Sequence, residues 1–211
     1  MALIKSALEL ALEKTKDVKL DDAALEANRI KTEGRKAGGA YLASPEETDL
    51  QAAIKTAKPE FREVFRKAVF EVLSAQIQLP SGPYDEGKFH VLAKGFATLA
   101  SMAPDPATSA GNAKKAAALV QNIAAFAAKY VEEVKRVEQA IRTQWAPKLK
   151  EKERQLAARM GQEVRLDPMS DPEFSAYYKQ NFEALRSNYS QALEGAKSDL
   201  AALCGIGEFG A

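Results

Sequence analysis

The chain has 211 residues, 46% of them apolar and 28% charged, and its 30 basic and 29 acidic side chains leave a net charge of +1. This composition is too apolar for a disordered chain, and the length allows one domain with a sizeable core. A single cysteine, Cys204, and a single histidine, His90, exclude an internal disulfide framework, a cysteine-based zinc site and any site that needs two imidazoles. The balanced charge gives no indication of nucleic acid or an anionic membrane as a partner.

The first predicted element is an amphipathic helix over residues 2–16, whose apolar side chains recur three and four residues apart. Charged residues interrupt this stretch, so we expect neither a secretory signal nor a membrane span, and we expect a cytoplasmic location. The helix is expected to dock on the body of the protein or on a second copy. Its apolar stripe consists of Leu3, Ile4, Ala7, Leu8, Ala11 and Leu12.

A second helix is expected to begin at Asp21 or Asp22, either of which could cap it, and to run toward Tyr41. It contains Gly34 and Gly38, four residues apart. The segment is too charged to span a membrane, so this spacing predicts either close contact with a neighbouring helix or a helix that ends near the second glycine.

The next helix is predicted to start at residues 44–47, because Ser44 and Glu47 could form a capping box with Pro45 at the first helical position. Pro59 should break or kink this helix, because proline lacks the backbone donor. A further apolar stripe runs from Phe61 to Ala75. A proline- and glycine-rich turn over 79–83 ends it, and another helix is expected from Phe89 to Met102.

Residues 103–112 are rich in proline, serine, threonine and glycine, and we expect an exposed, flexible connection there. Two long helices follow. The first should be kinked or ended by Pro147, and the turn at 161–170 should reverse the chain. Asp171 and Pro172 provide a cap and a first helical position for the second long helix, which should end at Gly205.

Folding the chain back about a centre near residue 166 predicts an antiparallel hairpin. In this register Trp145 is expected to lie buried in the hairpin core among Leu185, Arg186 and Tyr189. Ile141 is expected near Ala192.

No segment shows the alternation typical of strands, so the predicted fold class is all-α: an elongated helical bundle with a long antiparallel helical hairpin in its C-terminal half. The expected organisation is a helical segment of four or five helices over 1–102, a flexible connection over 103–112 and the hairpin over 113–204. A glycine-rich tail over 205–211 completes what we expect to be one structural unit.

Most motifs that resemble catalytic or ligand-binding sequences are better explained by helix ends and core packing. The tail contains a GxGxxG pattern, but it follows a helix and no helix can follow it, so a helix stop is expected rather than a dinucleotide site. Glu86 and His90 would share a helical face without further ligands, and Cys204 is expected to pack in the core. We therefore predict no metal, no cofactor and no catalytic residue.

One basic stripe is a candidate binding site for an anion or a partner. Its members are three and four residues apart and would line one face if the helix continued through Pro59. A phosphate or an acidic partner could use such a face, although a solvated helix face is the favoured explanation. The stripe consists of Lys55, Lys58, Arg62 and Arg66, flanked by Lys67.

These observations favour a non-enzymatic cytoplasmic helical scaffold or adaptor that binds another protein or itself through helical faces. The first alternative is a nucleic-acid or phosphate-binding protein that uses residues 55–67 and the basic excess of 129–159. The second is an enzyme whose site is assembled from distant segments.

Overall fold

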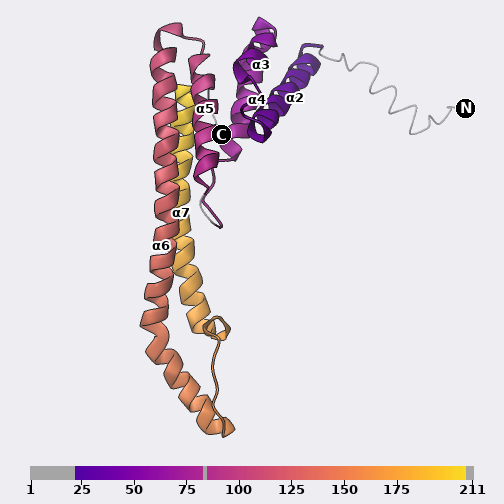
Figure 1. Cartoon of the computed structure of the whole chain (residues 1–211). Coiled ribbons are helices and arrows are strands. Elements are labelled where there is room, and N and C mark those ends of the chain that lie inside the picture. Colours follow the sequence, from indigo (N-terminus) through magenta and orange to yellow (C-terminus); the bar gives the residue numbers. More distant parts are fainter. Residues whose placement is uncertain (1–21, 83–84, 208–211) are drawn as a thin grey trace, which may run out of the picture. The chain divides into compact units, whose positions relative to one another are not determined.

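The computed structural model describes residues 22–82 and 85–207, and within these ranges every regular element is a helix (Figure 1). The all-α prediction is therefore confirmed. The helix predicted over 2–16 lies outside the described residues. The elements are α2 (Asp22–Ala43), α3 (Leu50–Thr56), the 3₁₀ helix η1 (Pro59–Phe61), α4 (Arg62–Ala75), α5 (Glu86–Ser101), α6 (Pro106–Met160), the 3₁₀ helix η2 (Pro168–Ser170) and α7 (Pro172–Leu203).

The chain forms two compact units, and the boundary falls inside α4 after Val72. In the first unit, α2 packs closely on α4 through two of its three glycines. A Cβ atom on Gly34 would lie 2.7 Å from the backbone oxygen of Phe65, and one on Gly38 would lie 3.0 Å from the Cβ of Val72. Of the two explanations for the glycine spacing, close helix contact is the correct one, and α2 continues past both glycines to Ala43.

The helix start predicted at residues 44–47 is wrong. These residues form a turn in which the Ser44 carbonyl accepts hydrogen bonds from the amides of Glu47 and Thr48. The helix α3 begins at Leu50, because the Asp49 carboxylate accepts from the Ala52 amide at 3.0 Å and caps it. The predicted break at Pro59 is present, since α3 ends at Thr56 and η1 precedes α4.

The second unit is built from α5, α6 and α7, whose buried side chains meet along the first half of α6. The segment 103–112 is not a loop throughout, because α6 already begins at Pro106. Proline is tolerated in the first turn of a helix, and alanine favours helix, so the loop-like composition was misleading. The core of this unit includes Leu92, Phe96, Leu99, Val120, Ile123, Ala127, Leu193, Leu200 and Cys204.

The helix α6 has 55 residues and continues through Pro147. Proline cannot donate to the carbonyl one turn earlier, so a bend rather than an end is the outcome here. Figure 1 shows that the C-terminal part of α6 bends away from the axis of its first part.

The helices α6 and α7 run antiparallel, but their register differs from the predicted one. Trp145 lies beside Phe174 and Tyr177, with ring centroids 5.7 and 5.8 Å apart, and not among residues 185–189. Ile141 belongs to the same cluster as Phe174 and is not near Ala192. Trp145 is also only partly buried, so the predicted core position is wrong as well.

The reason for the shifted register is the shape of the connection between the two helices. The chain reverses at Gly161, which has a φ of 67°, and then returns along α6, because the Leu166 amide donates to the Glu153 carboxylate at 2.9 Å. An extended residue advances about 3.3 Å, against about 1.5 Å in a helix. The connection therefore passes the last turns of α6 before α7 begins at Pro172.

Candidate interaction surface on the α6–α7 hairpin

Among the described helices, α6 and α7 alone form the outer part of the hairpin. Glu86, the first residue of α5, lines a hollow of about 470 Å³ together with Ala128, so α5 accompanies α6 only to about that level. Beyond it, α7 is the described helix of this unit that packs on α6. A pair of helices buries the side chains between them on two sides only, which leaves both edges of their contact open to solvent.

Aromatic side chains from both helices fill this contact. Tyr178 stacks on Phe182, with ring centroids 4.3 Å apart, and Trp145 meets the ring of Phe174 edge-on. Phe174 is fully buried, whereas Tyr178, Phe182 and Trp145 are half-buried. The contact is thus well packed at its centre and leaves aromatic surface exposed at its edges.

Tyr189 anchors the hairpin nearer the three-helix part of the unit. Its ring centroid lies 4.5 Å from that of Phe126 and 5.1 Å from that of Tyr130, and the residue is 8% exposed. Burial raises the pKa of the Tyr189 hydroxyl, and a hydrogen bond to the Glu133 carboxylate raises this pKa further. The Glu133 carboxylate therefore lies at the edge of this aromatic contact, where it meets the Tyr189 hydroxyl.

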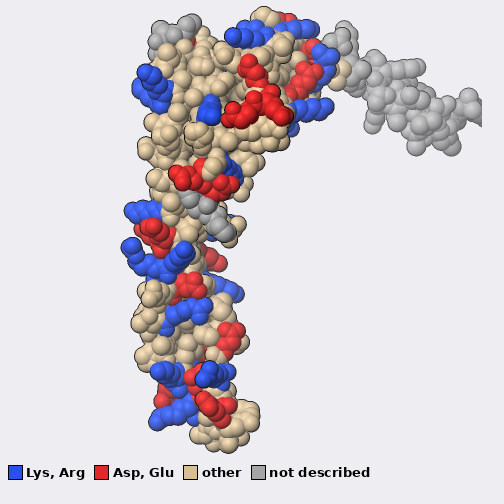
Figure 2. All heavy atoms as spheres, in the orientation of Figure 1, with Lys and Arg blue, Asp and Glu red and all other residues tan. Residues whose placement is uncertain are grey.

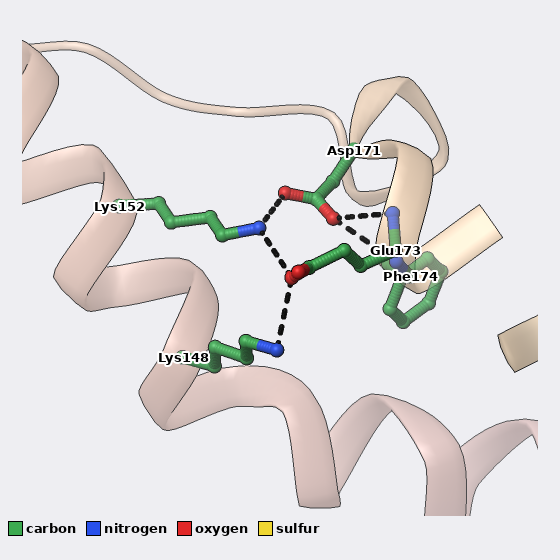
Figure 3. Close-up of polar contacts among 5 residues, drawn as sticks. All are labelled: Lys148, Lys152, Asp171, Glu173 and Phe174. Carbon is green, nitrogen blue, oxygen red and sulfur yellow. Dashed lines mark hydrogen bonds and ion pairs between the residues drawn. The ribbon is translucent and has the colours of Figure 1, made fainter. Parts of the chain in front are cut away.

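The start of α7 is fixed to α6 by charged side chains (Figure 3). Lys152 donates to both Asp171 and Glu173, and Lys148 lies 2.9 Å from the Glu173 carboxylate. Asp171 also caps α7 by accepting from the backbone amides of Glu173 and Phe174 at 3.1 and 3.0 Å. These two carboxylates are therefore engaged in holding the hairpin together.

Electrostatics within this network follow from the contacts. The hydrogen bond to Asp171, followed by that to Glu173, raises the pKa of the Lys152 ammonium. Lys152, and then the backbone amide of Phe174, hold the pKa of the Asp171 carboxyl below its ordinary value. Lys148 and Lys152 likewise lower the pKa of Glu173. These shifts keep Lys152, Asp171 and Glu173 charged at neutral pH, so the network acts as an ionic clamp.

The two edges of the hairpin contact differ in chemistry. One, here called the charged flank, carries residues of both signs at helical spacing: Lys135, Glu138, Arg142 and Lys150 of α6, and Lys179, Glu183, Arg186 and Glu194 of α7. Figure 2 shows basic and acidic side chains intermingled along the face of the hairpin that it displays, without a continuous basic patch. Such a surface is typical of a solvated helix face.

The opposite edge, here called the neutral flank, carries one charged residue, Glu133, and Lys129 lies at its margin 3.9 Å from that carboxylate. The hydrogen bond from the Tyr177 hydroxyl to Gln144 (3.3 Å) shows that side chains of both helices meet along this edge. Every member is exposed or half-buried: Leu119, Asn122, Phe126, Val137, Ala140 and Gln144 of α6, and Tyr177, Asn181, Ala184, Leu185, Asn188, Ala192 and Ala196 of α7.

A shallow hollow of about 210 Å³ lies at one end of the neutral flank, lined by Leu119, Asn122, Ile123, Phe126, Ala192, Leu193 and Ala196. Six of these seven side chains are apolar. At the other end, the Lys148–Glu173 ion pair closes the flank. Apart from Glu133 and the marginal Lys129, the flank is therefore a strip of uncharged side chains with a defined beginning and end.

The structure does not bring the predicted basic stripe together on one surface. Lys55 lies on α3, while Arg62, Arg66 and Lys67 lie on α4, because the helix breaks at Pro59. Lys58 forms an ion pair with Glu26 at 3.2 Å. Arg66 is only 2% exposed and belongs to the interior. Lys67 and Lys55 are exposed, but an anion-binding face made of all five residues does not form.

The packing and backbone of the helices account for the remaining candidate residues, which are His90, Cys204 and Gly205. His90 is exposed on α5 beside Glu86, and no cluster of three or more potential metal-ligating His, Cys, Asp or Glu side chains occurs within residues 22–82 and 85–207. Cys204 is buried, with its Sγ 3.8 Å from the Phe96 carbonyl, as expected for a packed thiol. Gly205 adopts a φ of 61° and ends α7, while the Ile206 amide donates to the Ala201 carbonyl, so the predicted helix stop is present.

Sequence reasoning missed the neutral flank altogether. It followed the apolar stripe of each long helix and did not divide the remaining surface into a charged and an uncharged side. A usable signal exists in α6, where no charged residue occurs between Lys115 and Lys129 on any face. It also missed the ion pairs of Asp171, which was predicted only as a cap.

Among the described helices, none combines the length and the apolar character needed to cross a bilayer. In comparison with known proteins, no curated protein and no solved structure matches the chain. Residues 51–202, which include α4, α5 and α6 and nearly all of α3 and α7, match a family of unknown function, DUF6657. The chain therefore belongs to the DUF6657 family.

Proposed function

We propose that this protein is a non-enzymatic helical scaffold or adaptor that binds a protein partner through the α6–α7 hairpin. The observation that carries the proposal is the neutral flank, a largely uncharged strip with half-buried Phe126 and Tyr177 along a two-helix arm. Protein interfaces are depleted of charged residues at their centre and enriched in aromatic ones, and an added helix is a common way to complete such a surface.

The carboxylates of the hairpin support this proposal over an enzymatic role. Asp171 and Glu173 are already bound by lysines and, for Asp171, by backbone amides, so their charges stabilise the arm. The proposal also includes the cytoplasmic location expected from the sequence, to which a chain with a single, buried cysteine is suited.

A photo-reactive amino acid placed on the neutral flank tests the proposal in the native cell. At Ala184, which is exposed, we expect a cross-linked adduct with a protein, either another protein or a second copy of this chain. The matched control is Ala176, an exposed alanine on the same helix that shares a face with Lys179. Absence of any protein adduct from Ala184, or equal adducts from both positions, would refute the proposal.

A further inference from the structure

We infer that the neutral flank is the contact surface between two copies of this chain, with α6 of each copy lying against α7 of the other. The inference rests on the proposed function and names its partner. Two such hairpins stacked face to face form a four-helix bundle, in which each two-helix layer supplies the missing layer of the other.

The size of the neutral flank fits a stable dimer. From Leu119 to Lys148 the flank is about 44 Å long at ~1.5 Å per residue, and two helices side by side are about 20 Å wide. The face therefore offers roughly 800 Å² on each copy, which is the area that each partner buries in a specific interface of standard size.

The charges at the ends of the flank select how two copies pair. Lys148 and Glu173 lie at one end, 2.9 Å apart. At the other end the pairing of Phe126 with Tyr189 places Lys115 near the level of Asp199, and both are exposed. At each end, then, α6 carries a lysine and α7 a carboxylate.

If both arms point in the same direction, α6 lies on the partner's α7, and opposite charges meet at both ends. Lys148 then faces the partner's Glu173, and Lys115 faces the partner's Asp199. If the arms point in opposite directions, α6 lies on the partner's α6, so that Lys115 faces the partner's Lys148 and Asp199 faces the partner's Glu173. Like charges directly opposed are unfavourable, so the first arrangement is the one the charges support.

The charge at the centre of the neutral flank also favours the arrangement in which both arms point in the same direction. In the opposed arrangement the midpoint of α6 between Lys115 and Lys148 falls near Glu133, so the two copies of Glu133 would approach each other. In the arrangement with both arms parallel, Glu133 faces the partner's α7 between residues 182 and 188, where the neutral-flank residues Ala184 and Asn188 carry no charge.

The first test is the mass of the full chain in solution by sedimentation equilibrium. We expect a concentration-dependent dimer of the 22.9 kDa chain. Ala184→Glu places a charge in the middle of the flank at an exposed helical position, so the variant should keep its helical circular dichroism and weaken dimerisation at least tenfold. Ala176→Glu, the control on the face of α7 that also carries Lys179, should dimerise like the unmodified chain.

The second test measures how the arms are oriented. A nitroxide at the exposed Met160, introduced as Met160→Cys with Cys204→Ser, reports the distance between the two hairpin tips by electron–electron double resonance. Arms in the same direction place the tips within about 40 Å, whereas opposed arms separate them by about 80 Å, given ~1.5 Å per residue on either side of the midpoint.

Three results would overturn the inference: an unmodified chain that stays monomeric at high micromolar concentration, a dimer that survives Ala184→Glu unchanged, or tips about 80 Å apart. The first two leave the proposed function standing if Ala184 still cross-links to a different protein in the cell. Loss of both the dimer and every protein adduct would instead refute the proposed function itself.

Discussion

The packing of α2 on α4 gives a prediction with an internal control, because α2 contains three glycines in different surroundings. Replacing glycine by alanine in a helix favours folding by about 1 kcal/mol when nothing is in the way. At Gly39 a Cβ atom meets nothing within 4 Å, so Gly39→Ala should raise the free energy of unfolding by nearly that amount. At Gly34 the same Cβ would lie 2.7 Å from the Phe65 backbone oxygen and 2.9 Å from the Ala68 Cβ.

Neither contact of Gly34 can be relieved by rotating a flexible side chain, so the two helices must move apart. Overpacking of this kind costs about 1–3 kcal/mol, which outweighs the gain in helix propensity, and we expect Gly34→Ala to destabilise by about 1–2 kcal/mol. Gly38→Ala should lie between the two, because the atoms it meets belong to the half-buried side chain of Val72.

Amide hydrogen exchange of the α2 and α4 peptides, measured by mass spectrometry, is the appropriate assay, because it reports the local free energy of opening within one unit. Exchange should be faster in Gly34→Ala and slower in Gly39→Ala than in the unmodified chain. Equal protection in the two variants would show that α2 and α4 do not approach closely at Gly34, and the argument from glycine spacing would fail.

Three further outcomes are expected. In chemical denaturation Phe174→Ala should lower the free energy of unfolding by about 3–5 kcal/mol, because the side chain is fully buried. Trp145→Ala should lower the free energy of unfolding less, because Trp145 is only half-buried. The reverse order would contradict the assigned register. The Asp171 carboxyl has a folded pKa below its ordinary 3.8, so its contribution is present above about pH 4 and lost as the pH falls through the lowered value. Asp171→Asn should therefore show less acid-induced loss of amide protection at the start of α7 between pH 6 and pH 3 than the unmodified chain. Gly205→Ala should lower the melting temperature more than Gly161→Ala. Both glycines have a positive φ, but of the two only Gly205 has neighbouring atoms within 3.4 Å of the new Cβ. Equal changes in melting temperature would contradict this prediction.

Local stereochemistry explains which features the sequence could predict. The glycine pair of α2, the Asp171–Pro172 helix start and the Gly205 stop each depend on a few neighbouring residues, and all three are present. The start at Ser44 was wrong because two possible caps lie within six residues of each other, and Asp49 is the one that the helix uses. Propensity alone does not decide between two such adjacent caps.

Non-local features could not be predicted in the same way. Whether the basic residues share a face depended on the helix continuing through Pro59, and the break separates Lys55 from Arg62. The burial of Arg66 follows from its place on the inner side of α4, between Phe65 and Phe70, which the charge pattern does not reveal. The hairpin register depended on the extended path of 161–167, whose length per residue is about twice that of a helix.

The register decides what the hairpin can do. With α7 set back by the return of the connection, the start of α7 meets Lys148 and Lys152, and the ion pairs close the hairpin near its bend. The same offset brings Tyr177 opposite Gln144 on the neutral flank. In the register predicted from a symmetric turn, Gln144 would lie near Asn188 and Lys148 would lie near Glu183, so Lys148 could not pair with Glu173 at the end of the flank. The position of the ionic clamp on α6 thus depends on how far an irregular connection shifts two helices past each other, a length that helical periodicity does not contain.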